Sequence, residues 1–243
     1  MRNSKISLGT WLSLYNEGIA EILANAGYEW ITIDLEHSSI SISQAEKLIR
    51  VIDNCGTKPF IRLSSNNDVQ IKRVLDAGAR GIIIPMVESE DDVKTAIEHI
   101  SYPPKGNRGM GLSRAQGYGE SAKKISYINE YSKQIELYIQ IESKAALTKL
   151  DELFSKEING YMIGPYDLSA SLGIPGDFTN SRFIEAEELI LERAKEYNIK
   201  RGYHIVEPDE KELDIKISNG YNFIAYSVDF RMLDVMARKP FKK

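Results

Sequence analysis

The sequence predicts an α/β protein whose fold is a (β/α)₈ TIM barrel, built as a single domain over residues 1–243. Short apolar runs alternate with longer helical patterns, eight such runs can be counted, and capping residues or glycines bound the helical segments. Strands that are buried on both faces and alternate with helices form parallel sheets with right-handed crossovers. Eight such units close into a barrel, and the chain length suits one barrel.

The expected strands follow one another at 7–11, 30–34, 59–63, 81–87, 136–142, 160–164, 201–206 and 222–228. Serine and aspartate are favoured at helix starts, where their side chains accept free backbone N–H groups. Helix starts are therefore expected at Ser43 (with Glu46 three residues later), Asp68, Ser89 and Ser143. Glycine commonly ends a helix, which is the role expected of Gly27, Gly56 and Gly78.

Residues 100–135 contain glycines, prolines and basic residues without clear periodicity. We expect a long loop there, and long loops in compact domains are usually functional or mobile. Because it comes after the fourth strand, the loop is expected near the barrel face that carries the other strand-to-helix loops.

Composition excludes several partners. The formal net charge is -4, from 31 basic and 35 acidic residues, which predicts no nucleic acid and no anionic membrane surface as partner. Cys55 is the single cysteine, as is usual in a reducing compartment. The N-terminal residues lack a signal-peptide pattern and no apolar run reaches the length of a membrane span. The expected location is the cytoplasm.

Polar side chains gather where the expected strands end. Barrel enzymes place their chemistry at these ends, because strands fix geometry while loops vary. The second strand ends in Asp34-Leu35-Glu36-His37, and the others supply Arg62, Gln140, Glu142, Asp167 and Asp229. Gln140 and Glu142 are two residues apart, so their side chains project from the same face of a strand. A site of carboxylate oxygens suits Mg²⁺ or Mn²⁺ better than zinc.

Each of these residues also has a purely structural interpretation. Glu142 and Asp167 could begin helices, and Arg62 could form a stabilising ion pair at the rim. His37 could be a loop histidine with Asp34 as its structural partner. The interpretation as a site depends on the shared position of these residues.

Several motifs in the same order resemble the HpcH/HpaI aldolases, which are metal-dependent, class II pyruvate aldolases. The resemblance covers nearly the whole chain, through ITIDLEH, PFIRLSSNNDVQIKRVLDAGARGIIIPMVES, YPPKGNRGMG, YIQIES and GYMIGPYDLSASLGIPGD. It implies a barrel of the phosphoenolpyruvate/pyruvate type. It also implies an aldehyde-lyase that cleaves or forms 4-hydroxy-2-oxo acids, with pyruvate and an aldehyde as partners.

The resemblance also implies roles for individual residues. The metal ligands correspond to Glu142 and Asp167, for Mg²⁺ or Mn²⁺, with Co²⁺ as a further candidate. Arg62 would neutralise the developing oxyanion, and His37, oriented by Asp34, would take the proton of the 4-hydroxyl group through a water. The substrate would contact Gln140 and the backbone around Gly164, Pro165 and Tyr166. Family members commonly form hexamers in which the last helix packs on a neighbouring subunit, so a homo-oligomer is expected.

Two cofactor types are not expected. No lysine stands at a strand end where a Schiff base would form, since Lys144 falls at a helix start. The segment GMG at 109–111 lacks the spacing and preceding strand of a dinucleotide fingerprint, so no nucleotide is expected.

The choice of aldehyde is left open by the sequence. Many family members continue DLEH with Gly-Pro and have a small residue before the metal aspartate, whereas here Ser38, Ser39 and Tyr166 stand at these positions. A polar or phosphorylated acceptor could be bound by His204, Arg108 and Arg114, or these residues could be structural. The competing functions are a CoA-thioester lyase of the citrate lyase beta type and a catalytically inactive barrel used for binding or assembly.

Overall fold

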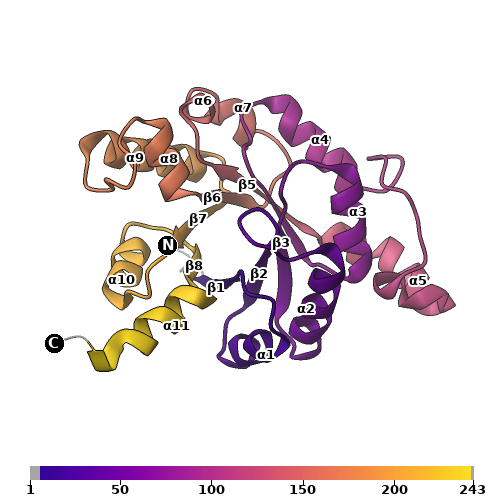
Figure 1. Cartoon of the computed structure of the whole chain (residues 1–243). Helices are drawn as coiled ribbons and strands as arrows, with labels where there is room; N and C mark the ends of the chain where they lie inside the picture. Colours follow the sequence, from indigo (N-terminus) through magenta and orange to yellow (C-terminus); the bar gives the residue numbers. More distant parts are fainter. Residues whose placement is uncertain (1–5, 242–243) are drawn as a thin grey trace.

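The computed structural model describes residues 6–241, and within them the chain forms a closed barrel of parallel strands surrounded by helices (Figure 1). Each strand pairs with the next along the chain, and β1 pairs with β8 to close the barrel. The strands are β1 (Ser7–Leu12), β2 (Trp30–Asp34), β3 (Lys58–Arg62), β4 (Gly81–Ile84), β5 (Glu136–Ile141), β6 (Gly160–Ile163), β7 (Lys200–Ile205) and β8 (Phe223–Val228). The predicted fold class is confirmed.

Several helices cover the outside of the barrel with one apolar face. In α2, for example, the buried residues Ala45, Leu48, Ile49 and Ile52 repeat at the helical spacing. The α-helices are α1 (Glu17–Asn25), α2 (Ile42–Asn54), α3 (Asp68–Ala77), α4 (Glu90–Ile100), α5 (Ser121–Asn129), α6 (Lys144–Leu147), α7 (Leu150–Phe154), α8 (Pro165–Ser171), α9 (Ser181–Glu196), α10 (Glu210–Ser218) and α11 (Asp229–Arg238). Short 3₁₀ helices are η1 (Arg114–Gly119), η2 (Tyr131–Gln134) and η3 (Lys239–Phe241). No helix among residues 6–241 is long and apolar enough to cross a membrane.

Three of the predicted helix starts are correct and one is displaced. Ser89 and Ser143 cap α4 and α6 as expected. Helix α2 instead begins after Ser41, whose side chain and that of Gln44 form a reciprocal capping box, so the expectation at Ser43 was wrong by two residues. Helix α3 is capped by Asn67, and Asp68 is its first residue. The three expected helix-ending glycines all have positive φ angles.

The interior of the barrel is filled by layers of side chains from alternate strands. Alternation along each strand points every second side chain inward. The aromatic part of this interior includes Trp30, Phe60, Tyr138 and Phe223, with Tyr138 and Phe223 stacked at a centroid distance of 4.0 Å. Gly9 makes room for the Trp30 ring, because a Cβ atom at position 9 would lie 2.1 Å from that ring. The layer above these aromatic side chains comes from β1, β3, β5 and β7 and consists of Trp11, Arg62, Gln140 and His204.

The segment between α4 and β5 differs from the expected loop in structure and in place. It contains η1, α5 and η2, and α5 stands outside the ring of helices (Figure 1). Since α4 returns the chain to the amino ends of the strands, this segment lies at the opposite end of the barrel from the strand-to-helix loops. The sequence-based placement overlooked that return. The fourth strand is also shorter than expected and ends at Ile84.

Candidate active site

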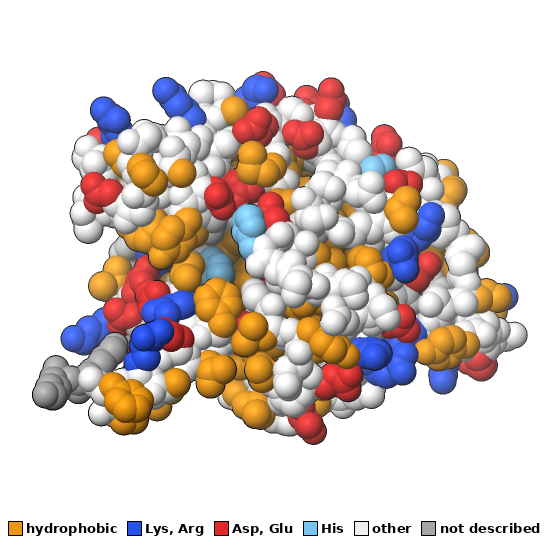
Figure 2. Space-filling model, in the orientation of Figure 1, with side chains coloured by type: hydrophobic (Ala, Val, Ile, Leu, Met, Phe, Trp, Pro, Cys, Tyr) orange, Lys and Arg blue, Asp and Glu red, His pale blue; other side chains and the backbone are white. Residues whose placement is uncertain are grey.

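A cavity of about 340 Å³ opens at the carboxyl ends of the strands. Space-filling Figure 2 shows a hollow on this side of the molecule, in which histidine and acidic side chains lie beside hydrophobic ones. The cavity is lined by Trp11, Ser13, Asp34, His37, Arg62, Gln140, Met162, Ile163, Gly164, Pro165, Tyr166, Asp167, His204, Val206, Val228 and Phe230. Eight of the nine residues predicted for the site therefore line one cavity, and the ninth, Glu142, contacts the Gln140 side chain.

Asp34 and Arg62 form a buried, two-pronged ion pair at the ends of β2 and β3. The Arg62 Nε and Nη2 atoms donate to the two Asp34 carboxylate oxygens at 2.9 and 2.7 Å. Asp34 also accepts the backbone N–H groups of Glu36 and His37. Burial raises the pKa of Asp34, but the guanidinium and the two N–H groups outweigh burial and hold that pKa below its usual value. Asp34 is therefore a carboxylate that fixes Arg62 and the turn after β2.

The imidazole of His37 projects toward solvent at the rim of the cavity, with its side chain 63% exposed. Its nearest acidic atom belongs to Glu36, at 3.9 Å. Within the described part of the chain, the Asp34 carboxylate makes no hydrogen bond to this ring. The predicted orienting contact between Asp34 and the imidazole is thus replaced by a contact with the His37 backbone.

Glu142 is buried just beyond the end of β5. Its Oε1 atom accepts the backbone N–H of Met86 at 2.6 Å, and its Oε2 atom accepts a hydrogen bond from the Gln140 amide. Burial, together with the charges of Glu36 and Asp167, raises the pKa of Glu142 to about 7, although the Met86 N–H and Arg62 oppose this shift. A buried carboxyl in this environment needs a proton or a cation for compensation.

Asp167 lies in the first turn of α8 and is exposed. Gly164 precedes that turn, and a Cβ atom there would lie 2.8 Å from Glu142 Oε2 and 2.7 Å from Gln140 Nε2. Glycine thus keeps the space between these groups open. Tyr166 is half exposed and meets Phe178 edge to face at 5.1 Å, which fixes its ring at the cavity wall.

The side chains around Glu142 fit a hard cation. The Oε1 atom of Gln140 is buried without a hydrogen-bond partner, and burial, followed by the charges of Glu36 and Asp167, raises the pKa of Glu142. Residues 6–241 contain no ready group of three or more His, Cys, Asp or Glu side chains for a metal. Two carboxylates completed by water or substrate are a common arrangement for Mg²⁺, which seldom has an all-protein cage.

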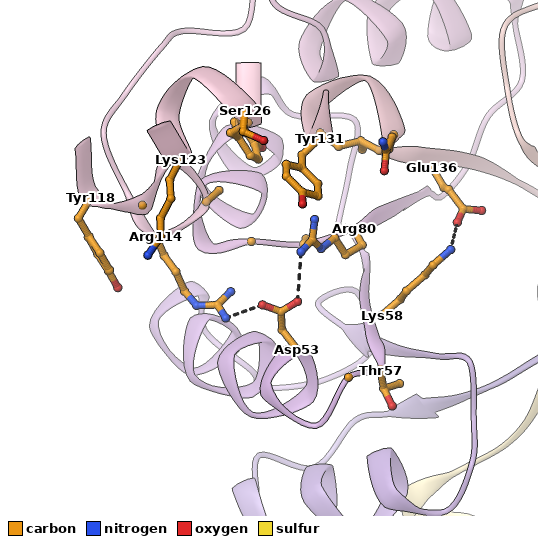
Figure 3. A pocket seen from close by; sticks show the side chains of 18 of the residues that line it. Asp53, Thr57, Lys58, Arg80, Arg114, Tyr118, Lys123, Ser126, Tyr131 and Glu136 are labelled. Carbon is orange, nitrogen blue, oxygen red and sulfur yellow. Dashed lines mark hydrogen bonds and ion pairs between the residues drawn. The ribbon is translucent and has the colours of Figure 1, made fainter. Parts of the chain in front are cut away.

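The candidate basic residues of the 100–135 segment lie outside this cavity. Arg108 is buried against Asp76 and Tyr127, and Arg114 binds Asp53 and the Ala77 carbonyl. Arg114 lines a larger cavity of about 1110 Å³ at the amino end of the barrel (Figure 3). The charged contacts drawn there join Asp53 to Arg80 and Arg114, and Lys58 to Glu136 (Figure 3). A role for Arg108 and Arg114 in binding the acceptor from within the same chain is therefore wrong.

Three residues with a part in the site were given no role from the sequence. Glu36 lies 3.2 Å from Arg62 as a second acidic neighbour. Trp11 lies under the guanidinium, with Arg62 Cζ 5.3 Å from its ring. Met86 has a φ angle of +52°, unusual for a residue with a side chain, and this conformation accompanies the N–H contact to Glu142. An aromatic residue on an inward strand position was the available signal for Trp11, whereas a backbone contact leaves no sequence signal.

Inward-facing acidic, guanidinium and imidazole groups at the carboxyl ends of a closed eight-stranded barrel define a barrel enzyme. The model of the HpcH/HpaI aldolase/citrate lyase family matches residues 7–234. The chain belongs to this family, as its motifs indicated.

Named relatives specify the activity further. A 2-keto-3-deoxy-L-rhamnonate aldolase of Escherichia coli O17:K52:H18 is 34% identical over 94% of this chain and 85% of its own length. A hydroxypyruvate/pyruvate aldolase of Sagittula stellata is 32% identical over 98% of this chain and 92% of its own length. The solved structure of an HpcH/HpaI aldolase/citrate lyase family protein from Burkholderia cenocepacia superposes with a TM-score of 0.91, at 28% identity over 99% of this chain and 95% of that chain. The chain is accordingly a class II aldolase, a carbon–carbon lyase.

Proposed function

We propose that this aldolase uses a divalent cation, Mg²⁺ or Mn²⁺, to make or break the bond between pyruvate and an aldehyde in 4-hydroxy-2-oxo acids. The observation that carries the proposal is the buried Glu142 carboxyl, whose pKa is raised to about 7 beside two other acids and an unpartnered amide oxygen. Glu142 and Asp167 would hold the cation, which when bound supplies Lewis-acid stabilisation of enolate charge.

Each of the remaining site residues has a role that follows from its position in the cavity. Arg62 would stabilise the negative charge that develops on the keto oxygen, since its guanidinium is already fixed by Asp34. The amide of Gln140 and the backbone of Gly164, Pro165 and Tyr166 would orient the keto acid. His37, exposed at the rim, would exchange the 4-hydroxyl proton through a water. Pro165 and Tyr166 open helix α8 at the wall of the cavity.

The proposal includes a homo-oligomer, with the hexamer as its expected form. Helix α11 has Asp229 as its buried residue and exposes Phe230, Leu233 and Met236, while Phe241 follows in η3. An exposed apolar stripe of this kind typically marks a protein contact. We place the enzyme in the cytoplasm and propose that residues 1–243 form a single domain.

The test measures pyruvate release from a 4-hydroxy-2-oxo acid with lactate dehydrogenase and NADH as the coupled reporter. Turnover is expected with added Mg²⁺ or Mn²⁺ and is expected to stop in excess EDTA. Full activity in EDTA would refute the metal requirement. Activity on a CoA thioester, with no activity on any 4-hydroxy-2-oxo acid, would refute the proposed substrate class.

A further inference from the structure

His204 is a cavity residue without a part in the chemistry described above. It is the β7 member of the layer that also contains Trp11, Arg62 and Gln140, and it lines the cavity with them. Its ring stacks on Trp11 with centroids 4.5 Å apart and an interplanar angle of 16°. The orientation of the imidazole is therefore fixed by packing.

One ring nitrogen of His204 is fixed by the end of β8. Its Nε2 atom lies 3.2 Å from the carbonyl oxygen of Ser227. A carbonyl only accepts, so Nε2 carries the hydrogen in this contact. Ser227 has a φ angle of +58°, and its hydroxyl donates to the Val206 carbonyl at 3.0 Å. These two features hold the Ser227 carbonyl in position.

The other ring nitrogen is left as an acceptor. Burial, reinforced by the positive charge of Arg62, lowers the pKa of His204 to about 4, so the ring is neutral near pH 7. With the hydrogen on Nε2, Nδ1 keeps its lone pair. Within residues 6–241, the Ser227 carbonyl is the one hydrogen-bond partner found for this ring.

The surroundings of His204 favour a neutral donor from the ligand. Several neighbouring wall residues are apolar, and the nearby Arg62 and Asp34 are occupied with each other. His204 is only partly buried, so water can solvate Nδ1 until a donor from the substrate takes the place of that water. The apolar residues of the wall include Trp11, Met162, Ile163, Pro165, Val206, Val228 and Phe230.

We propose that Nδ1 of His204 accepts a hydrogen bond from a hydroxyl group of the substrate, so that the enzyme favours a hydroxylated substrate over its deoxy counterpart. The inference rests on the proposed aldolase function. The hydroxyl has two possible sources, the C3 hydroxyl of a hydroxylated keto acid or the α-hydroxyl of the aldehyde.

The test compares wild type with His204→Phe, which keeps a ring on Trp11 and removes the acceptor. Aldol formation is measured for hydroxypyruvate against pyruvate with acetaldehyde, and for glycolaldehyde against acetaldehyde with pyruvate. The variant should lose about tenfold in kcat/KM for the hydroxylated member of one pair, which is the size of one neutral hydrogen bond. The pair that shows the loss identifies the source of the hydroxyl. His204→Asn, which places an amide oxygen near Nδ1, should recover part of the loss.

The controls separate the two proposals. His99→Phe, the same substitution in α4, should leave all rates unchanged. Equal losses for hydroxylated and deoxy substrates in His204→Phe would overturn the role of Nδ1 and indicate packing alone. Absence of aldol activity from the wild type with every pair and metal would instead refute the proposed function.

Discussion

Asp34 faces the guanidinium of Arg62 and not the imidazole of His37, and both carboxylate oxygens take part in the contact. The pair stands on neighbouring strands, β2 and β3, at positions that are partners in register. The acid three residues before His37 in sequence thus serves to fix the arginine.

Asp34→Asn should destabilise the fold, because it leaves the buried guanidinium without its charge partner. The expected loss at pH 7 is about 3 kcal/mol, measured by urea unfolding. The folded-state pKa of Asp34 is lowered, so its stabilising contribution is present above the unfolded-state pKa and is lost as pH falls through the folded value. The difference between wild type and variant should shrink below about pH 4. A difference independent of pH would contradict this account.

Glu142→Gln should have opposite effects on metal binding and on metal-free stability. Mn²⁺ affinity in calorimetry and metal-dependent turnover should both collapse, because a carboxylate ligand is lost. The raised pKa means that the native carboxyl costs stability as pH rises from its unfolded value to about 7. In EDTA at pH 8, the variant should therefore melt above wild type, and the gain should vanish near pH 4. Lower stability of the variant in EDTA at pH 8 would show that the acid is compensated by the protein itself.

His37→Ala should reduce aldol turnover about 10²-fold or more, the usual contribution of a general base. The exposed ring makes no hydrogen bond in the described residues, so melting temperature and Mn²⁺ affinity should stay near wild type. A lost metal site would assign His37 to metal binding instead.

Glu136→Gln probes the amino end of the barrel, away from the chemistry. Lys58 and Lys200 contact the two Glu136 oxygens at 2.7 and 2.8 Å, and the Tyr138 hydroxyl also donates there. Removing the shared acid leaves two lysines facing each other, so the variant should unfold at lower urea concentration. Its kcat/KM should match wild type. A large loss of activity with unchanged stability would link this end to the site.

Leu233→Asp combined with Met236→Asp should weaken the assembly, because both side chains are exposed on α11. Light scattering coupled to size-exclusion chromatography should report a smaller mass for the variant than for wild type. The matched substitution Ile22→Asp, at an exposed position of α1, serves as the control. An unchanged mass in the double variant would remove α11 from the interface.

Periodicity and chain order predicted the barrel, and strand-end position predicted which residues gather in the cavity. Strand-end position did not predict which side chains contact each other. Asp34 could have contacted either Arg62 or His37, and the register between β2 and β3 places it against Arg62. The 100–135 segment was misplaced because the reversal made by α4 was overlooked when the segment was assigned to the carboxyl face. His204 was a candidate without a role until its stacking on Trp11 and its contact with Ser227 were known.

Met86 contributes to the site through its backbone, while its side chain is 56% exposed. The requirement at this position is a local conformation that presents one amide to Glu142, and different side chains can meet that requirement. A substitution at residue 86 that keeps this backbone conformation would therefore keep the contact. A search for invariant residues among relatives would pass over a position whose backbone N–H contacts the Glu142 carboxylate.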